Sequence, residues 1–177
     1  MTRSSQSVSA LMVALAFLSL LLSGAIFGFF YAWVCSTMWG LDAIDPRVAI
    51  QAMQGMNASV RNGVFMPAFF LTPVVMLLTA AVALRAGRRI SGLAFGAGGL
   101  VYLTGGLILT AAVNVPMNEA LARIEVPQDV MAARDIWAAY SPRWQMFNTV
   151  RTVVSAVALL GAGVGLFYLR PGQAAAT

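Results

Sequence analysis

The most informative stretch of the chain for the fold is residues 64–113, VFMPAFFLTPVVMLLTAAVALRAGRRISGLAFGAGGLVYLTGGLILTAAV. They hold two apolar runs, 64–84 and 90–113, separated by a short link that carries three arginines. Each run is close to the roughly 20 residues that an α-helix needs to cross the hydrocarbon core of a bilayer. The stretch therefore predicts two transmembrane helices joined by a tight basic turn.

Two further apolar runs flank this hairpin. The first, residues 8–34, is too long for the apolar segment of a secretion signal, which has about 7–15 residues, so we expect a retained helix. The last, residues 152–169, continues a helix that begins near Arg143. Only 10% of the 177 residues are charged, against about 25% in soluble domains. We predict one all-α membrane domain, a four-helix transmembrane bundle with spans at 8–34, 64–84, 90–113 and 144–169.

The arginines predict the orientation of the bundle. All eleven basic residues are arginine. The segment before the first span, the short link and the segment after the last span contain arginine and no acid, at Arg3, at Arg85, Arg88 and Arg89, and at Arg170. The positive-inside rule then predicts an integral protein of the cell (inner) membrane with both termini in the cytoplasm. Contact with membrane lipids is expected. No basic run is interleaved with aromatic residues, so nucleic acid is excluded as a partner.

The two longer connections, 40–62 and 115–142, predict a small cap of extracytoplasmic helices. Ser141-Pro142 is expected to end the last cap helix, because proline disfavours a helical conformation in the residue before it. The cap helices are expected at residues 46–57, 118–125 and 127–140.

The chain lacks several kinds of catalytic chemistry. It has one cysteine, Cys35, and no histidine, so we predict neither a metal site nor a cofactor. The four apolar runs contain no Asp, Glu or Lys. Proton-coupled transporters usually need a carboxylate at membrane depth, so a transporter is the least favoured function.

Polar residues gather instead where the spans meet the cap. Three positions of the last span, Trp144, Asn148 and Arg151, share one helix face by their i, i+4, i+7 spacing. Asn114 and the residues after it follow the third span at the same predicted depth. Arg151 borders the hydrocarbon and needs an anionic or carbonyl partner, since an unpaired charge there is costly. Glu119 is one candidate partner, and a bound acidic ligand is another.

This cluster has a structural and a functional interpretation. Structurally, the asparagines satisfy backbone groups left free by Pro116, while Arg151 clamps the cap or contacts a lipid head group. Functionally, the cluster forms a semi-polar pocket for an aromatic or phenolic molecule, in which Arg151 stabilises an oxyanion and amide groups orient the ligand.

Three motifs carry a family resemblance. They are QAMQGMN at 51–57, NVPMN at 114–118 and WQMFNTVRT at 144–152, with residues 62–65 leading into the second span. With the helix layout, they resemble the anthrone oxygenase-like family of small four-helix membrane proteins, long catalogued as a domain of unknown function. Gly63 departs from the family, in which proline frequently follows Asn62, and proline appears later here, at Pro67.

The resemblance implies an oxidoreductase, because fungal members are associated with oxidising anthrones to anthraquinones. It also implies that the residues at the motif positions of this sequence form a candidate site. We assign catalytic roles to the residues suited to stabilising or orienting a substrate oxyanion, namely Arg151, Asn148, Asn114 and Asn118. We assign substrate-binding roles to the surrounding positions, namely Gln54, Asn57, Trp144, Met117 and Glu119.

Two functions remain compatible with these residues. The first is a cofactor-independent oxygenase for a phenolic, anthrone or quinol-like substrate, with Glu119 or Asp135 as the base. The second is a non-enzymatic protein that binds a lipid or quinone, or an accessory subunit of a larger membrane assembly. Glycines four residues apart predict close helix contacts and are compatible with a homo-oligomer or a partner subunit. These pairs are Gly24 and Gly28, Gly92 and Gly96, and Gly161 and Gly165.

Overall fold

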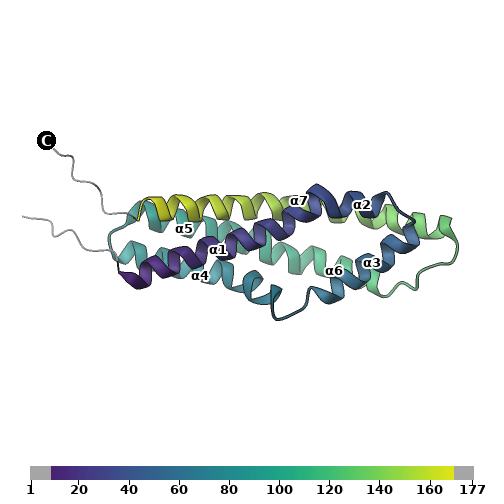
Figure 1. Cartoon of the computed structure of the whole chain (residues 1–177), viewed down its shortest axis with the longest axis horizontal. Helices are drawn as coiled ribbons and strands as arrows, with labels where there is room; N and C mark the ends of the chain where they lie inside the picture. The colour runs from purple at the N-terminus through teal and green to yellow at the C-terminus, as the bar shows by residue number, and fades with distance from the viewer. Residues whose placement is uncertain (1–8, 170–177) are drawn as a thin grey trace, which may run out of the picture.

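The computed structural model describes residues 9–169 and contains helices but no strand in that range (Figure 1). Four helices are long and apolar enough to cross a membrane, as expected of an integral membrane protein. They are Ala10–Asp42, Phe65–Arg85, Arg89–Ala122 and Val130–Phe167. The all-α four-helix prediction is confirmed. Arg3, Arg170 and residue 8 of the first predicted span lie outside the described residues.

Two of the long helices contain π-helical turns. The first consists of α1 (Ala10–Ala32), the π-turn η1 (Trp33–Thr37) and α2 (Met38–Asp42). The third consists of α5 (Arg89–Tyr102), η2 (Leu103–Ile108), η3 (Thr110–Asn114) and α6 (Val115–Ala122). The second and fourth are α4 (Phe65–Arg85) and α7 (Val130–Phe167). One further helix, α3 (Pro46–Ser59), belongs to the cap.

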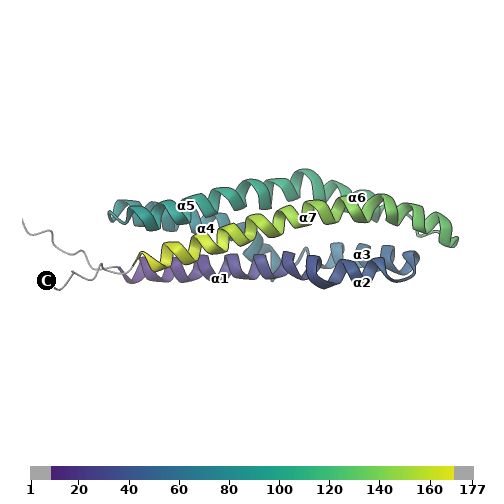
Figure 2. The same ribbon diagram turned by 90° about the horizontal axis from the view of Figure 1, so that it is seen from above.

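The spans form an elongated bundle with the cap at one end. In the ring of neighbours, α1 contacts α4, α4 contacts α5, α5 contacts α7, and α7 contacts α1. Figure 2 shows α7 lying between α5 and α1. The start of α1, the α4–α5 turn and the end of α7 share one end, whereas α2, α3 and α6 lie at the other (Figure 1). The cap therefore covers only one end of the bundle.

The α4–α5 turn is a compact helix stop built on Gly87. This residue has a φ of 74°, which an L side chain rarely adopts. The Gly87 amide donates to the Leu84 carbonyl at 3.0 Å, and the Arg88 amide donates to the Ala83 carbonyl at 2.9 Å. This pair of bonds satisfies the last carbonyls of α4 by the Schellman pattern. The turn sets α4 and α5 side by side.

Glycines bring α5 and α7 close together. A Cβ atom added at Gly161 would lie 2.9 Å from the Ala94 carbonyl oxygen and 3.4 Å from the Gly98 Cα atom. The close contact expected at Gly161 is therefore present. Gly24 and Gly28 do not have this role, since a Cβ at Gly24 would meet Leu159 at an ordinary 3.8 Å and one at Gly28 would meet nothing within 4 Å.

Pro73 lies inside α4, and a residue of α5 compensates for it. Proline has no amide hydrogen, so the carbonyl four residues earlier, that of Phe69, loses its helical donor. The fully buried Tyr102 donates its hydroxyl to this carbonyl at 3.1 Å. A side chain of α5 thus satisfies the backbone of α4.

The prediction that Ser141-Pro142 ends a helix is wrong, because α7 runs through Pro142 without a break. Tertiary contacts on both sides of the proline hold the helix. Ser141 donates to the Asp42 carboxylate at 2.7 Å, and Trp137 and Trp144 belong to one buried apolar cluster. These contacts offset the cost of about 3 kcal/mol for an interior proline.

The short helix α6 starts and ends earlier than the predicted 118–125, at Val115 and Ala122. It continues the third span directly, so no loop separates the span from this part of the cap. The polar residues of this segment are consequently held on a helix that begins inside the bundle.

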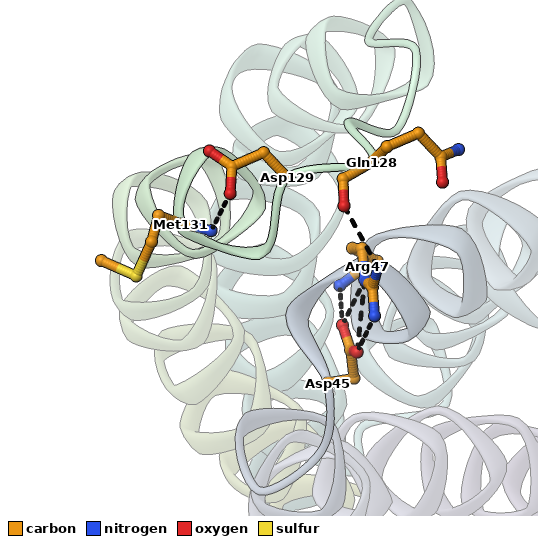
Figure 3. Close-up of polar contacts among 5 residues, drawn as sticks. All are labelled: Asp45, Arg47, Gln128, Asp129 and Met131. Atoms are coloured by element: carbon orange, nitrogen blue, oxygen red, sulfur yellow. Dashed lines mark hydrogen bonds and ion pairs between the residues drawn. The ribbon is translucent and has the colours of Figure 1, made fainter.

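An ion pair fastens the cap at its far end (Figure 3). Asp45 accepts the Arg47 amide at 2.9 Å, which starts α3, and its carboxylate pairs with the Arg47 guanidinium at 2.6 Å. The Arg47 side chain also donates to the Gln128 carbonyl at 3.1 Å, next to Asp129, which begins α7. Hydrogen bonding to Arg47 lowers the pKa of Asp45 to about 2.

Candidate functional site

A cavity of about 270 Å³ lies where the cap meets the bundle. Its volume is close to the lower end of small-molecule sites, which run from about 300 to 1,000 Å³. Aromatic and aliphatic side chains form most of its wall, and polar groups converge at a few points. The lining residues from α1, η1, α3 and the segment after α3 are Phe29, Phe30, Trp33, Met56, Asn57, Val60 and Arg61. Those from α4, η3, α6 and α7 are Phe65, Met66, Phe69, Phe70, Thr110, Val115, Asn118, Glu119, Trp144, Asn148 and Arg151.

Arg151 is the buried charge of this cavity, with only 5% of its surface exposed. Its guanidinium donates to Asn148 Oδ1 at 3.0 Å and to Thr110 Oγ1 at 3.5 Å. It also lies 4.6 Å from the ring centre of Phe30 and 5.1 Å from that of Trp144, within cation–π range. Its buried Nε atom has no hydrogen-bond partner. Within residues 9–169, no carboxylate forms an ion pair with it.

Asn148 is held from both sides. Its amide nitrogen donates to the Phe30 carbonyl at 3.1 Å, and its amide oxygen accepts from Arg151. Phe30 lies shortly before the π-turn η1, where the regular α-helical ladder of the first helix changes. The two bonds fix which way the Asn148 amide points, and so fix the guanidinium beside it.

Asn118 joins α6 to the aromatic face of α7. Its amide oxygen accepts from the Tyr140 hydroxyl at 2.8 Å and from Trp144 Nε1 at 3.0 Å. Asn57 from α3 donates to the Tyr140 hydroxyl at 3.4 Å. The network orients Trp144, whose ring faces Arg151. Tyr140, which sequence reasoning assigned only to the cap, therefore supports the site through Asn118 and Asn57, although it does not line the cavity.

Glu119 is not the partner of Arg151 that the sequence suggested. It lines the cavity but lies 3.5 Å from the Arg61 guanidinium, and both side chains are about half exposed. Asp135, the other suggested base, is exposed on α7 and does not line the cavity. Arg151 is instead held by neutral groups and aromatic rings.

Three predicted site residues lie outside the cavity wall. Gln54 donates to the carbonyls of Leu121 and Ile124, each at 2.9 Å, and so fastens α3 to the end of α6. Met117 packs against the apolar cluster of the cap. Asn114 ends the π-turn η3 and is fully buried, and neither amide atom has a partner. The structure thus separates these residues from Asn57, Asn118, Trp144, Asn148 and Arg151, which it brings together.

The first helix supplies residues that sequence reasoning missed. Phe29, Phe30 and Trp33 form one wall of the cavity, and Trp33 lies 5.0 Å from Trp144 between ring centres. An aromatic cluster at the cap end of the first apolar run was the available signal. Asp42 was missed as well, and its carboxylate accepts from Trp137, Ser141 and Gln145 at 2.7 to 2.8 Å. No feature of the sequence pairs these residues.

Within residues 9–169, no group of three or more His, Cys, Asp or Glu side chains is placed to hold a metal ion. The cavity offers a cationic donor, amide groups and aromatic rings. These groups suit a planar aromatic ligand that carries an oxygen able to take negative charge.

Comparison with known proteins identifies a family for this chain. A family model described as anthrone oxygenase matches residues 56–161, more than half of the chain. The match includes the last turn of α3, α4, the third helix and most of α7, which together supply most of the cavity wall. No curated protein and no solved structure matches the chain.

Proposed function

We propose that this chain, which belongs to the anthrone oxygenase family, oxidises an anthrone, phenol or quinol-like substrate with dioxygen in the cavity beneath the cap. The proposal rests mainly on the environment of Arg151. It is a buried guanidinium that borders an apolar cavity, has a free Nε donor and has no carboxylate partner among the described residues.

A buried charge of this kind favours an anionic ligand. Transfer of an isolated charge from water to a protein interior is costly, and a nearby opposite charge offsets the cost. An enolate or phenolate oxygen near the guanidinium would supply that charge and accept a hydrogen bond from it. Because Asn148 and the rings of Phe30 and Trp144 already hold the guanidinium, it would not need to reorganise as the negative charge develops.

In the proposed oxidation, the substrate and dioxygen are the only reactants. Loss of a proton from the ring CH₂ of an anthrone gives an enolate, which passes one electron to dioxygen. The resulting radical and superoxide combine at that carbon and take up a proton to form a hydroperoxide. Loss of water from the hydroperoxide leaves a carbonyl. In total, anthrone and O₂ give anthraquinone and H₂O, and each product receives one atom of the dioxygen.

Glu119 is our proposed proton acceptor. Of the carboxylates in residues 9–169, it is the one that lines the cavity. The carboxylate lies 3.5 Å from the Arg61 guanidinium, so this ion pair would be given up when the carboxylate accepts the substrate proton. The same pairing is the observation that favours our second candidate, a protein that binds a quinone or lipid in this cavity without turnover.

Oxygen uptake by the detergent-purified protein tests the proposal. With an anthrone, the wild-type chain should consume one O₂ for each anthraquinone formed. Arg151→Met should lower the rate about 100-fold or more, the usual effect of removing a group that stabilises an oxyanion. Arg134→Gln is the matched control, since this exposed arginine lies outside the cavity. Binding without oxygen uptake would support the second candidate, and no binding would refute both.

We also propose that the chain lies in the inner membrane with the cap outside the cytoplasm. Arg85, Arg88 and Arg89 lie at the bundle end opposite the cap, and the positive-inside rule places such a turn in the cytoplasm. With Cys35 replaced by serine, an impermeant maleimide should label Gln128→Cys and not Arg89→Cys from the outside. Labelling of Arg89→Cys alone would reverse the orientation.

A further inference from the structure

A second hollow adjoins the cavity on the cap side. It also measures about 270 Å³, and it lies between α3 and α6. Four residues line both spaces, namely Asn57, Arg61, Asn118 and Glu119. The residues that line only the outer hollow are Gln54, Ala58, Ala122 and Arg123. A single ligand in contact with these shared residues would touch both spaces.

The outer hollow differs from the cavity in character. It has no aromatic residue in its wall, whereas the cavity is mostly aromatic and aliphatic. Its charged residues are two arginines and one glutamate, which gives a net charge of +1. Glu119 lies near Arg61 at 3.5 Å, and no carboxylate among residues 9–169 forms an ion pair with Arg123.

Two of the carbonyl groups near Arg123 accept hydrogen bonds from a side chain of α3. Arg123 is the residue that directly follows α6. The last carbonyl groups of a helix would repel an anion if they had no hydrogen-bond donor. Gln54 donates to the carbonyls of Leu121 and Ile124, each at 2.9 Å. These bonds weaken the repulsion between the carbonyl oxygens and an anion bound nearby. The positive charge of Arg123, which lines the hollow, can therefore attract an anion there.

We infer that the ligand of this protein has two parts, an aromatic body in the cavity and an anionic substituent, such as a carboxylate, in the outer hollow near Arg123. The inference rests on the proposed function, because it takes the aromatic body to occupy the cavity at Arg151. It names the substrate class more closely: an acidic aromatic compound rather than a neutral one. The shared amides of Asn57 and Asn118 would lie along the connection between the two parts.

A matched pair of product-like ligands tests this inference without turnover. Anthraquinone carboxylate and anthraquinone carboxamide have similar shapes and differ in charge. Binding is measured by quenching of tryptophan fluorescence, because Trp33 and Trp144 line the cavity. Nanodiscs of phosphatidylcholine keep anionic lipid out of the assay. The wild-type chain should bind the carboxylate about fivefold more tightly, the size of one exposed charge pair.

Three variants test separately whether an anionic substituent lies near Arg123 and whether the aromatic body lies in the cavity at Arg151. Arg123→Gln should bring the ratio of the two affinities close to one, while Arg134→Gln, an exposed arginine outside both hollows, should leave it unchanged. Arg151→Met should weaken both ligands equally. A ratio near one in the wild-type chain, or a ratio that Arg123→Gln does not change, would overturn the inference alone. Absence of binding by both ligands would overturn the proposed function with it.

Discussion

The hydrogen bond from Tyr102 to the Phe69 carbonyl gives a sharp test of how the site is supported. Phe69 lines the cavity, and its carbonyl lacks a helical donor because Pro73 follows four residues later. Tyr102→Phe removes the hydroxyl that now donates to it at 3.1 Å. A buried carbonyl without a donor costs about 1–3 kcal/mol. For a chain of this size, that corresponds to a fall in Tm of about 2–12 °C.

A double-mutant cycle isolates this interaction. Pro73→Ala restores an amide hydrogen that can donate to the Phe69 carbonyl within α4. In the Pro73→Ala background, Tyr102→Phe should therefore cost about 1 kcal/mol less than in the wild-type background. Thermal unfolding in detergent measures both costs. Tyr31→Phe is the control, because this ring is 49% exposed and should change Tm little. Equal costs of Tyr102→Phe in the two backgrounds would show that the hydroxyl does not replace the donor that Pro73 lacks.

Three further predictions concern the packing and the cap. Asp42→Asn should lower the unfolding free energy by about 1–2 kcal/mol in chemical denaturation, since a carboxylate that accepts three hydrogen bonds becomes neutral. Gly161→Ala should destabilise the bundle, because the new Cβ would lie 2.9 Å from a carbonyl oxygen, whereas Gly163→Ala meets nothing within 4 Å and should be neutral or stabilising. The pKa of Asp45, lowered to about 2, means that its stabilising contribution is complete above its unfolded pKa near 4 and is lost as pH falls toward 2. Asp45→Asn should remove that part of the pH dependence of Tm.

The bundle could be predicted from the sequence because the bilayer imposes a simple rule. A span needs about 20 apolar residues, and runs of that length are visible without any knowledge of packing. The cap is harder to predict, because its helices are short and depend on tertiary contacts. Pro142 shows the difficulty: local propensity predicts a stop, while contacts of Ser141 and the neighbouring tryptophans keep α7 continuous.

The candidate site could be predicted in part for a similar reason. Trp144, Asn148 and Arg151 share a face by helical spacing, and the structure brings them together on the cavity wall. Spacing along one helix says nothing of which residues another helix places opposite. Phe30 and Tyr140 were therefore missed, since their roles arise from contacts between elements distant in sequence.

Pairing of charges was the least predictable feature. The sequence suggested Glu119 as a partner of Arg151, whereas the structure pairs Glu119 with Arg61. The choice depends on the exit angle of α3 and the start of α6, which no sequence pattern specifies. The consequence is chemical: Arg151 is left to neutral partners and is available to an anionic ligand.

The ionisation of a bound ligand tests the role of Arg151 most directly. A hydroxylated anthrone, titrated without oxygen in the presence of the protein, reports its ionised fraction by absorbance. We predict that binding to the wild-type chain lowers the pH of half-ionisation by about 1–3 units, the effect of an opposite charge within a few ångströms. Arg151→Met should bind the anthrone without this shift. An unchanged half-ionisation pH in the wild-type complex, or the same shift in Arg151→Met, would show that Arg151 does not stabilise the ligand oxyanion.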